Sequence, residues 1–310
     1  MSSPVRWPEN KSFAFTVFDD TDSTTLENGP PVYSFLADCG FRTTKSVWPT
    51  RGSGVPSDNG GTCHEPGYLA WVKSLQSRGF EIGYHMATSH TSTREETIAA
   101  LEYFKQCFGH YPVSMANHYH SNEDIYFGDA RLSGANRLLY NLLTRFQNHS
   151  RFRGHVPGDP LFWGDHCKQK IQYVRNFVFA DINTLKVCPE MPYHDPARPY
   201  VNYWYASSEG ANARSFIARL DERNQDRLEA EGGACIMYTH FGLGFYENKT
   251  LNPQFKRLME RLSKRNGWFV PVSTLLDYLI STKGSTTLNA GQTKQLERKW
   301  LSHKIRFGTA

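Results

Sequence analysis

Short apolar segments alternate with amphipathic segments along most of the chain. Segment 12–18 (SFAFTVF) is rich in aromatic and β-branched residues, which is typical of a buried strand. Similar strands are predicted at 43–49, 80–85, 112–116, 177–179, 233–239 and 268–271. Helical periodicity lies between them, at 31–40, 66–78, 93–108, 131–146, 213–230, 252–265 and 273–280. This alternation predicts a parallel α/β sheet with right-handed crossovers, either doubly wound or closed into a (β/α) barrel.

The length of 310 residues suits one large α/β domain. We expect residues 1–282 to form it, with 283–310 as a polar and basic C-terminal extension that is weakly helical around 296–305. No apolar run has the length of a signal peptide or a membrane span, so we expect a cytoplasmic protein. The six cysteines are scattered without a CxxC pair, and we expect them to be reduced.

The net charge of +5 is a small and dispersed excess of basic residues. No basic block is interleaved with aromatic residues and no zinc-finger spacing occurs, so a nucleic-acid partner is not expected. Aromatic residues make up 14% of the chain, which suits carbohydrate stacking and equally an aromatic core.

Polar side chains follow most of the predicted strands. They are Asp19 and Asp20, His85, Asn117 and His118, Asp181, and His240. Because active sites of such folds lie at the carboxyl ends of the strands, we expect these residues to share one site. A structural alternative remains for Asp22, which could cap a following helix.

Two adjacent carboxylates raise each other's cost of ionisation, and a nearby cation would relieve their repulsion. A useful division of roles is one carboxylate on a metal and one free as a base. His85 and His90 add imidazole ligands, and an Asp–His–His set suits a divalent metal, with Zn²⁺ preferred. His240 could then protonate a leaving amine.

Three segments in this order, SFAFTVFDDTD, GFEIGYHMATSH and YTH, resemble the successive motifs of the polysaccharide deacetylase superfamily (carbohydrate esterase family four). WFVPVSTLLDYL resembles the closing strand and helix of that family, and the resemblance covers residues 10–282. It implies a distorted, seven-stranded (β/α) barrel. It also implies that Asp19 is the catalytic base, that Asp20, His85 and His90 bind the metal, and that His240 is the general acid.

Two motifs depart from the family pattern. Four residues separate His85 from His90 where the family has three, so either a π-bulge absorbs the insertion or one histidine has left the metal. The arginine that steadies the base is missing from the stretch that contains Asn117, His118 and Tyr119, and His118 or His120 could replace it or join the metal. The candidates for substrate binding are Asn117, His118, Tyr119, Asp181 and Trp204.

The function implied is hydrolysis of a carbon–nitrogen bond other than a peptide bond, by removal of an acetyl group from an N-acetylated sugar or glycan precursor. Two alternatives stay open: an amidase acting on a non-sugar C–N bond, and a catalytically impaired member that binds glycan. The expected partner is therefore a carbohydrate or a small amide, with self-association into a homo-oligomer left open.

Overall fold

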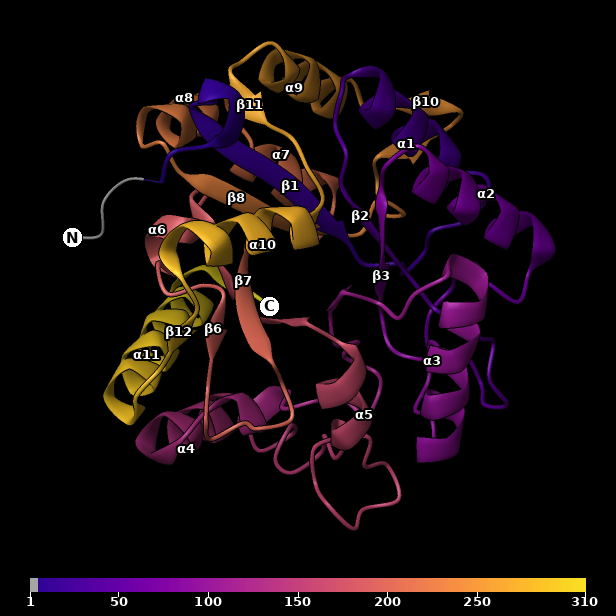
Figure 1. The fold of residues 1–310 in the computed structure, drawn as a ribbon, viewed down its shortest axis with the longest axis vertical. Helices are drawn as coiled ribbons and strands as arrows, with labels where there is room; N and C mark the ends of the chain where they lie inside the picture. The colour runs from indigo at the N-terminus through magenta and orange to yellow at the C-terminus, as the bar shows by residue number, and fades with distance from the viewer. Residues whose placement is uncertain (1–4) are drawn as a thin grey trace.

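Seven parallel strands close into a barrel in the computed structural model, which describes residues 5–310 (Figure 1). The ring runs β1, β2, β3, β4, β5, β7, β8 and closes because β8 pairs with both β7 and β1. The barrel strands are β1 (Phe13–Asp19), β2 (Thr44–Val47), β3 (Glu81–Tyr84), β4 (Ser114–Met115), β5 (Tyr173–Phe179), β7 (Tyr203–Ser208) and β8 (Ala234–Thr239). The barrel alternative is thus confirmed over the doubly wound sheet.

Short strands extend the sheet outside the ring. β11 (Gly267–Trp268) pairs with β1, β6 (Tyr193–His194) pairs with β7, and β12 (Thr286–Thr287) pairs with β6. A separate hairpin joins β9 (Tyr246–Glu247) to β10 (Thr250–Leu251).

Helices surround the barrel (Figure 1). They are α1 (Gly29–Asp38), α2 (Pro66–Ser77), α3 (Arg94–Phe108), α4 (Gly134–Leu143), α5 (Gly164–Lys170), α6 (Thr184–Val187), α7 (Ala213–Arg219), α8 (Glu222–Ala230), α9 (Pro253–Ser263), α10 (Val272–Lys283) and α11 (Ala290–Phe307), with short 3₁₀ turns η1 (Pro8–Asn10) and η2 (Gly128–Arg131). The single helix predicted at 213–230 is two helices, because Asp221 caps a new one by accepting from the Asn224 amide.

The closed barrel and its layer of helices explain why these strands are buried along their whole length. Every residue of β1, β2, β5 and β8 is buried, since side chains on one face fill the barrel and those on the other contact the helices. The aromatic residues Phe18 and Tyr205 meet inside it, with ring centroids 6.3 Å apart. Charged residues on these strands, such as Lys45 and Arg175, are therefore exceptional and need partners.

The C-terminal segment is packed against the barrel. The boundary predicted at residue 282 falls inside α10, and β12 and α11 continue from there onto the body formed by the preceding residues. α11 lies beside α4 and β5 (Figure 1), with Trp300 fully buried. Glu297 is also fully buried, and Asn136 on α4 donates to its carboxylate at 2.8 Å.

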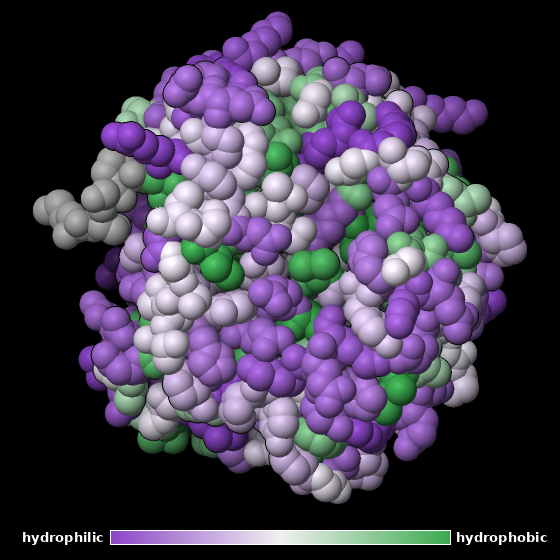
Figure 2. Space-filling view, in the orientation of Figure 1, coloured by the Kyte–Doolittle hydropathy of each residue, from purple (hydrophilic) through white to green (hydrophobic). Residues whose placement is uncertain are grey.

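Hydrophilic side chains dominate the face drawn in Figure 2, where apolar surface is confined to small separate areas. In the described part of the chain, no helix has the length and apolar character needed to cross a membrane. The six cysteines are all free thiols, as predicted.

Candidate active site

Asp19, the last residue of β1, is enclosed away from the barrel mouth. Its carboxylate accepts hydrogen bonds from the Tyr33 hydroxyl (2.8 Å) and the Phe241 amide (2.7 Å), and it lies 3.1 Å from Lys45 Nζ. Burial raises the pKa of Asp19, and the opposite charge of Lys45 offsets only part of that shift. These contacts connect β1 with α1, β2 and the loop after β8. Asp19 therefore joins elements of the barrel and does not face the cavity.

Asp20 points into the barrel mouth and is paired with an arginine from β5. Arg175 donates two parallel hydrogen bonds to it, from Nη1 to Oδ1 at 2.8 Å and from Nη2 to Oδ2 at 2.5 Å. Burial alone lowers the pKa of Arg175, but the Asp20 carboxylate more than compensates and raises it. The two hydrogen bonds therefore hold the Asp20 carboxylate in a fixed orientation at the edge of the cavity.

Asp22 lies among histidines that follow two other strands. His85, after β3, places Nε2 at 3.0 Å from Asp22 Oδ2, and His118, after β4, places Nε2 at 2.9 Å from Oδ1. Asp58 Oδ2 lies 3.1 Å from the same His118 nitrogen. Ligand atoms of Asp22, His85 and His118 all lie within 4.8 Å of one another, and all three residues are buried.

The donors and acceptors of this group fit a cation. His85 Nδ1 faces the Ala116 carbonyl at 3.2 Å, so Nδ1 carries a proton and Nε2 is the ring nitrogen that faces Asp22. Asp22 Oδ2 is buried and has no hydrogen-bond partner among the described residues, although that nitrogen is close. A divalent cation between Nε2 and Oδ2 would give both atoms a partner. Two histidines and a carboxylate form a ligand set used by catalytic zinc, with a further position open.

The pKa shifts of Asp22 and His118 also favour a cation at this point. Burial by itself raises the pKa of Asp22, but His85 and His118 outweigh it and hold that pKa well below its usual range. Burial by itself lowers the pKa of His118, but hydrogen bonds to Asp22 and Asp58 raise it to about 10. The carboxylates thus attract positive charge to this point in the structure.

His240, after β8, faces the same cavity from the other side. Its Nδ1 lies 2.7 Å from the Ala211 carbonyl, so Nε2 points inward, 3.4 Å from Asp22 Oδ2 and 3.9 Å from Asp20 Oδ2. The contact between Nδ1 and the carbonyl fixes the orientation of the ring, so that Nε2 is the nitrogen that faces the cavity.

His90 is not brought to this group. Its Nε2 accepts a hydrogen bond from the Gly54 amide at 3.0 Å. The chain turns at Met86 (φ 64°) and continues through 87–93 without a helix, so no π-bulge absorbs the insertion. The ligand set inferred from the resemblance needs revision here, because a histidine whose Nε2 already accepts from a backbone amide in another loop does not direct that lone pair at the metal.

The remaining predicted residues divide between the cavity and the protein body. Asn117, His118 and Tyr119 line the cavity. Asp181 instead pairs with Arg227 at 3.0 Å, and Trp204 is fully buried in the core, so neither lines it. Asn117 also bonds the backbone of Ile125 through both ends of its amide, which fixes the loop after β4.

Sequence reasoning missed several cavity residues that a closer reading of the strands could have found. Arg175 is the one arginine in the apolar segment 173–179, and a buried arginine requires a carboxylate. Asp22 is two residues from Asp20, the spacing that returns to the same side of an extended chain. Asp58, Arg131 and Lys304 carry no local signal.

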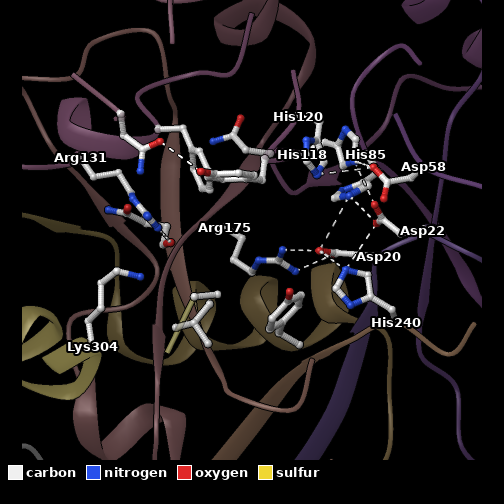
Figure 3. A pocket seen from close by; sticks show the side chains of 18 of the residues that line it. Asp20, Asp22, Asp58, His85, His118, His120, Arg131, Arg175, His240 and Lys304 are labelled. Atoms are coloured by element: carbon white, nitrogen blue, oxygen red, sulfur yellow. Dashed lines mark hydrogen bonds and ion pairs between the residues drawn. The ribbon is translucent and has the colours of Figure 1, made fainter. Parts of the chain in front are cut away.

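One cavity of about 600 Å³ contains these groups (Figure 3). Asp20, Asp22, His85, His118 and His240 gather at one end, and Arg175 lies between them and a second end that holds Arg131 and Lys304. The cavity is large enough for a small organic molecule.

No protein-family model and no curated protein sequence matches the chain. Solved structures do match its fold. A protein assigned as a polysaccharide deacetylase from Mycobacterium smegmatis superposes with a TM-score of 0.55 at 14% identity, over 93% of this chain and 97% of that one. The chain has the polysaccharide deacetylase fold.

Two further structures with this fold agree. The Puue allantoinase superposes with a TM-score of 0.53 at 11% identity, over 91% of this chain and 94% of that one. A protein assigned as a polysaccharide deacetylase from Pseudomonas aeruginosa PAO1 gives 0.52 at 10% identity, over 90% and 94%. The fold implied by the motif resemblance is thus confirmed.

Proposed function

We propose that the protein is a metal-dependent hydrolase that removes an acetyl group from an N-acetylated sugar or a related small N-acyl compound. The observation that carries the proposal is the meeting of three units at one end of one cavity: the Asp22–His85–His118 group, the Asp20–Arg175 pair and His240. Relative to the sequence prediction, the base moves from Asp19 to Asp20, and the metal ligands become Asp22, His85 and His118.

A divalent cation held by Asp22, His85 and His118 would supply Lewis-acid polarisation of the acyl oxygen and lower the pKa of an attacking water. We propose Zn²⁺, because two imidazoles and one carboxylate suit it. Asp58 Oδ2 lies 3.1 Å from His118 Nε2, so its negative charge would add to the attraction for that cation.

Asp20 is the base in this proposal. Its Oδ2 takes a proton from the water as the carbon–oxygen bond forms, and Arg175 keeps the carboxylate ionised and aimed at the cavity. His240 is the general acid: its Nε2 gives a proton to the amide nitrogen as the carbon–nitrogen bond breaks, and the Ala211 carbonyl stabilises the imidazolium through Nδ1. The products are acetate and a free amine.

One second candidate rests on the shape of the site. The cavity has a volume of about 600 Å³, which suits a small molecule better than the interior of a polymer. Because the allantoinase named above has the same fold, an amidase acting on a non-sugar C–N bond is the alternative. A cytoplasmic location, which the sequence predicts, would also favour a small or nucleotide-linked substrate.

The test measures metal content by plasma mass spectrometry beside acetate release from a panel of N-acetylated sugars and small amides. The proposal expects about one equivalent of Zn²⁺ in the wild type, lost in Asp22→Ala and retained in Asp20→Asn, with acetate release lost in both. Asp181→Asn is the matched control, since that carboxylate is outside the cavity. Metal binding without any hydrolysis would favour the impaired, ligand-binding alternative, and absence of metal would refute the proposal.

A further inference from the structure

The cavity continues beyond the hydrolytic groups to an end that carries positive charge (Figure 3). Arg131, at the end of η2, and Lys304, on α11, both line it there. Neutral polar side chains of Thr144, Gln147 and Asn148 also line the cavity. Neither Arg131 nor Lys304 takes part in the hydrolysis proposed above.

Arg131 is buried without a counter-ion. Its side chain is enclosed (4% exposed) between the rings of Phe127 and Trp300, whose centroids lie 4.3 and 4.5 Å from the guanidinium carbon. Nη1 donates to the Asn176 carbonyl at 3.2 Å, and Nε has no partner among the described residues. Burial lowers the pKa of Arg131. An unpaired guanidinium is costly to bury, so its retention at a cavity wall indicates a ligand.

Neighbouring arginines show the contrast. Arg137, Arg175 and Arg198 each pair with an aspartate. In the range 5–310, Arg131 forms no such pair; its guanidinium packs on two aromatic rings, and the residue lines the cavity. A planar fork of this kind matches the oxygens of a carboxylate or a phosphate.

Lys304 adds a second positive charge at the same end. Its Nζ donates to the Thr309 carbonyl at 2.9 Å, and within the described chain it has no carboxylate partner. Burial, together with the nearby charge of Arg131, lowers the pKa of Lys304 to about 8. Arg131 and Lys304 carry like charges that repel each other, and an anion placed between them would relieve that repulsion.

We propose that Arg131 and Lys304 bind an anionic group, a carboxylate or a phosphate, on the substrate whose amide bond lies at the Asp22–His85–His118 end. This inference rests on the proposed function, which assigns hydrolysis to the opposite end of the cavity, and it adds the class of substrate. The substrate is an anionic N-acyl small molecule that spans the cavity, with its anion at one end and its scissile amide at the other.

A binding experiment tests the anion site without the hydrolytic activity. The full chain carrying Asp22→Asn, treated with chelator, is titrated with inorganic phosphate by calorimetry, so that no metal can bind the probe. Phosphate binding is expected, and it should weaken by about tenfold or more in Arg131→Gln and in Lys304→Gln added to that background. Arg223→Gln, which removes one exposed charge from α8, should leave it unchanged. Undetectable binding in the Asp22→Asn protein, or equal binding in all variants, overturns the proposal.

Arg131 is packed between two rings, so its loss could unfold the protein. Arg131→Lys keeps a charge there, and Lys304→Gln changes a side chain at the edge, so melting temperatures of all variants are compared before titration. If Arg131→Gln does not fold, the phosphate affinity of Lys304→Gln alone decides the proposal.

A kinetic arm distinguishes the two anions and separates this proposal from the function itself. N-acetylglucosamine 6-phosphate is compared with N-acetylglucosamine, and N-acetylglutamate with N-acetylglutamine. In one pair the anionic member should have a kcat/KM about tenfold higher or more, a preference that Lys304→Gln reduces towards unity. Phosphate binding without hydrolysis of any probe would refute the proposed function and support the anion site. Hydrolysis with equal kcat/KM for charged and neutral members, without phosphate binding, would support the proposed function and refute the anion site.

Discussion

Arg175 holds Asp20 through two parallel hydrogen bonds that join β5 to the end of β1 across the mouth of the barrel. The residues are 155 positions apart, and both are buried. A carboxylate held in this way keeps its charge and its direction, which are the two properties needed of a base.

Replacing Arg175 with glutamine should lower kcat by about 10²- to 10⁴-fold, because the base loses its orientation. Metal content should stay near that of the wild type, because Arg175 is not a ligand in our proposal. Breaking a buried pair also costs about 3–5 kcal/mol of unfolding free energy, so denaturant unfolding is measured beside the kinetics. A variant that lost its metal but retained its rate per bound metal would contradict this role for Arg175.

Two buried histidines make a matched pair for the ligand assignment. His118→Ala should remove the metal, because Nε2 of His118 lies 2.9 Å from Asp22 in the proposed ligand group. His90→Ala should retain it, because His90 Nε2 accepts from the Gly54 amide instead. Metal content by mass spectrometry, after dialysis under identical conditions, separates the two. Loss of metal in the His90 variant would restore the assignment based on the family resemblance.

His240 is expected to matter only where the leaving group needs a proton. His240→Gln should lower kcat for an N-acetyl amide by about 10²- to 10⁴-fold. It should change hydrolysis of 4-nitrophenyl acetate by much less, because nitrophenolate leaves without protonation. Equal losses on amide and ester would indicate that His240 binds substrate or metal rather than acting as an acid.

Glu123 should make stability depend on pH. Its carboxyl is fully buried, and burial raises its pKa from 4.5 to about 8. The folded state therefore prefers the protonated form, so the stabilising effect is complete below pH 4.5 and is lost as pH rises towards 8. Glu123→Gln should increase the unfolding free energy by about 1–3 kcal/mol at pH 8 and change it little at pH 4.

Urea unfolding at both pH values measures this effect. Glu95→Gln, an exposed carboxylate on α3, is the control and should show no such difference. If the Glu123 variant were destabilised equally at both pH values, the carboxylate would be ionised and paired in the folded protein.

The barrel could be predicted from the sequence because its strands have a strong local pattern. Segment 12–18 is apolar throughout, and the capping box at Thr93 and Glu96 marks the start of α3, where both reciprocal hydrogen bonds are present. β7 was missed because Tyr203–Ser208 begins with aromatic residues and ends with small polar ones, so it resembles a loop. Its strand character depends on pairing with β5 and β8, which a local pattern does not contain.

The site was harder to predict for two physical reasons. Adjacent residues of an extended chain point to opposite sides, so Asp19 turns into the core while Asp20 faces the cavity. The other reason is sequence distance. His118 and Arg175 reach the site from β4 and β5, and nothing in one sequence indicates which distant side chains will meet Asp22 and Asp20.

The two ends of the cavity come from different parts of the chain. Asp20, Asp22, His85, His118 and His240 follow barrel strands, whereas Arg131 and Lys304 belong to η2 and to a helix laid on the outside of the barrel. Chemistry and selectivity are therefore encoded in separable segments. Lys304 can be exchanged without changing any residue of a strand, so a Lys304→Glu protein becomes a starting point for an enzyme that accepts cationic amides.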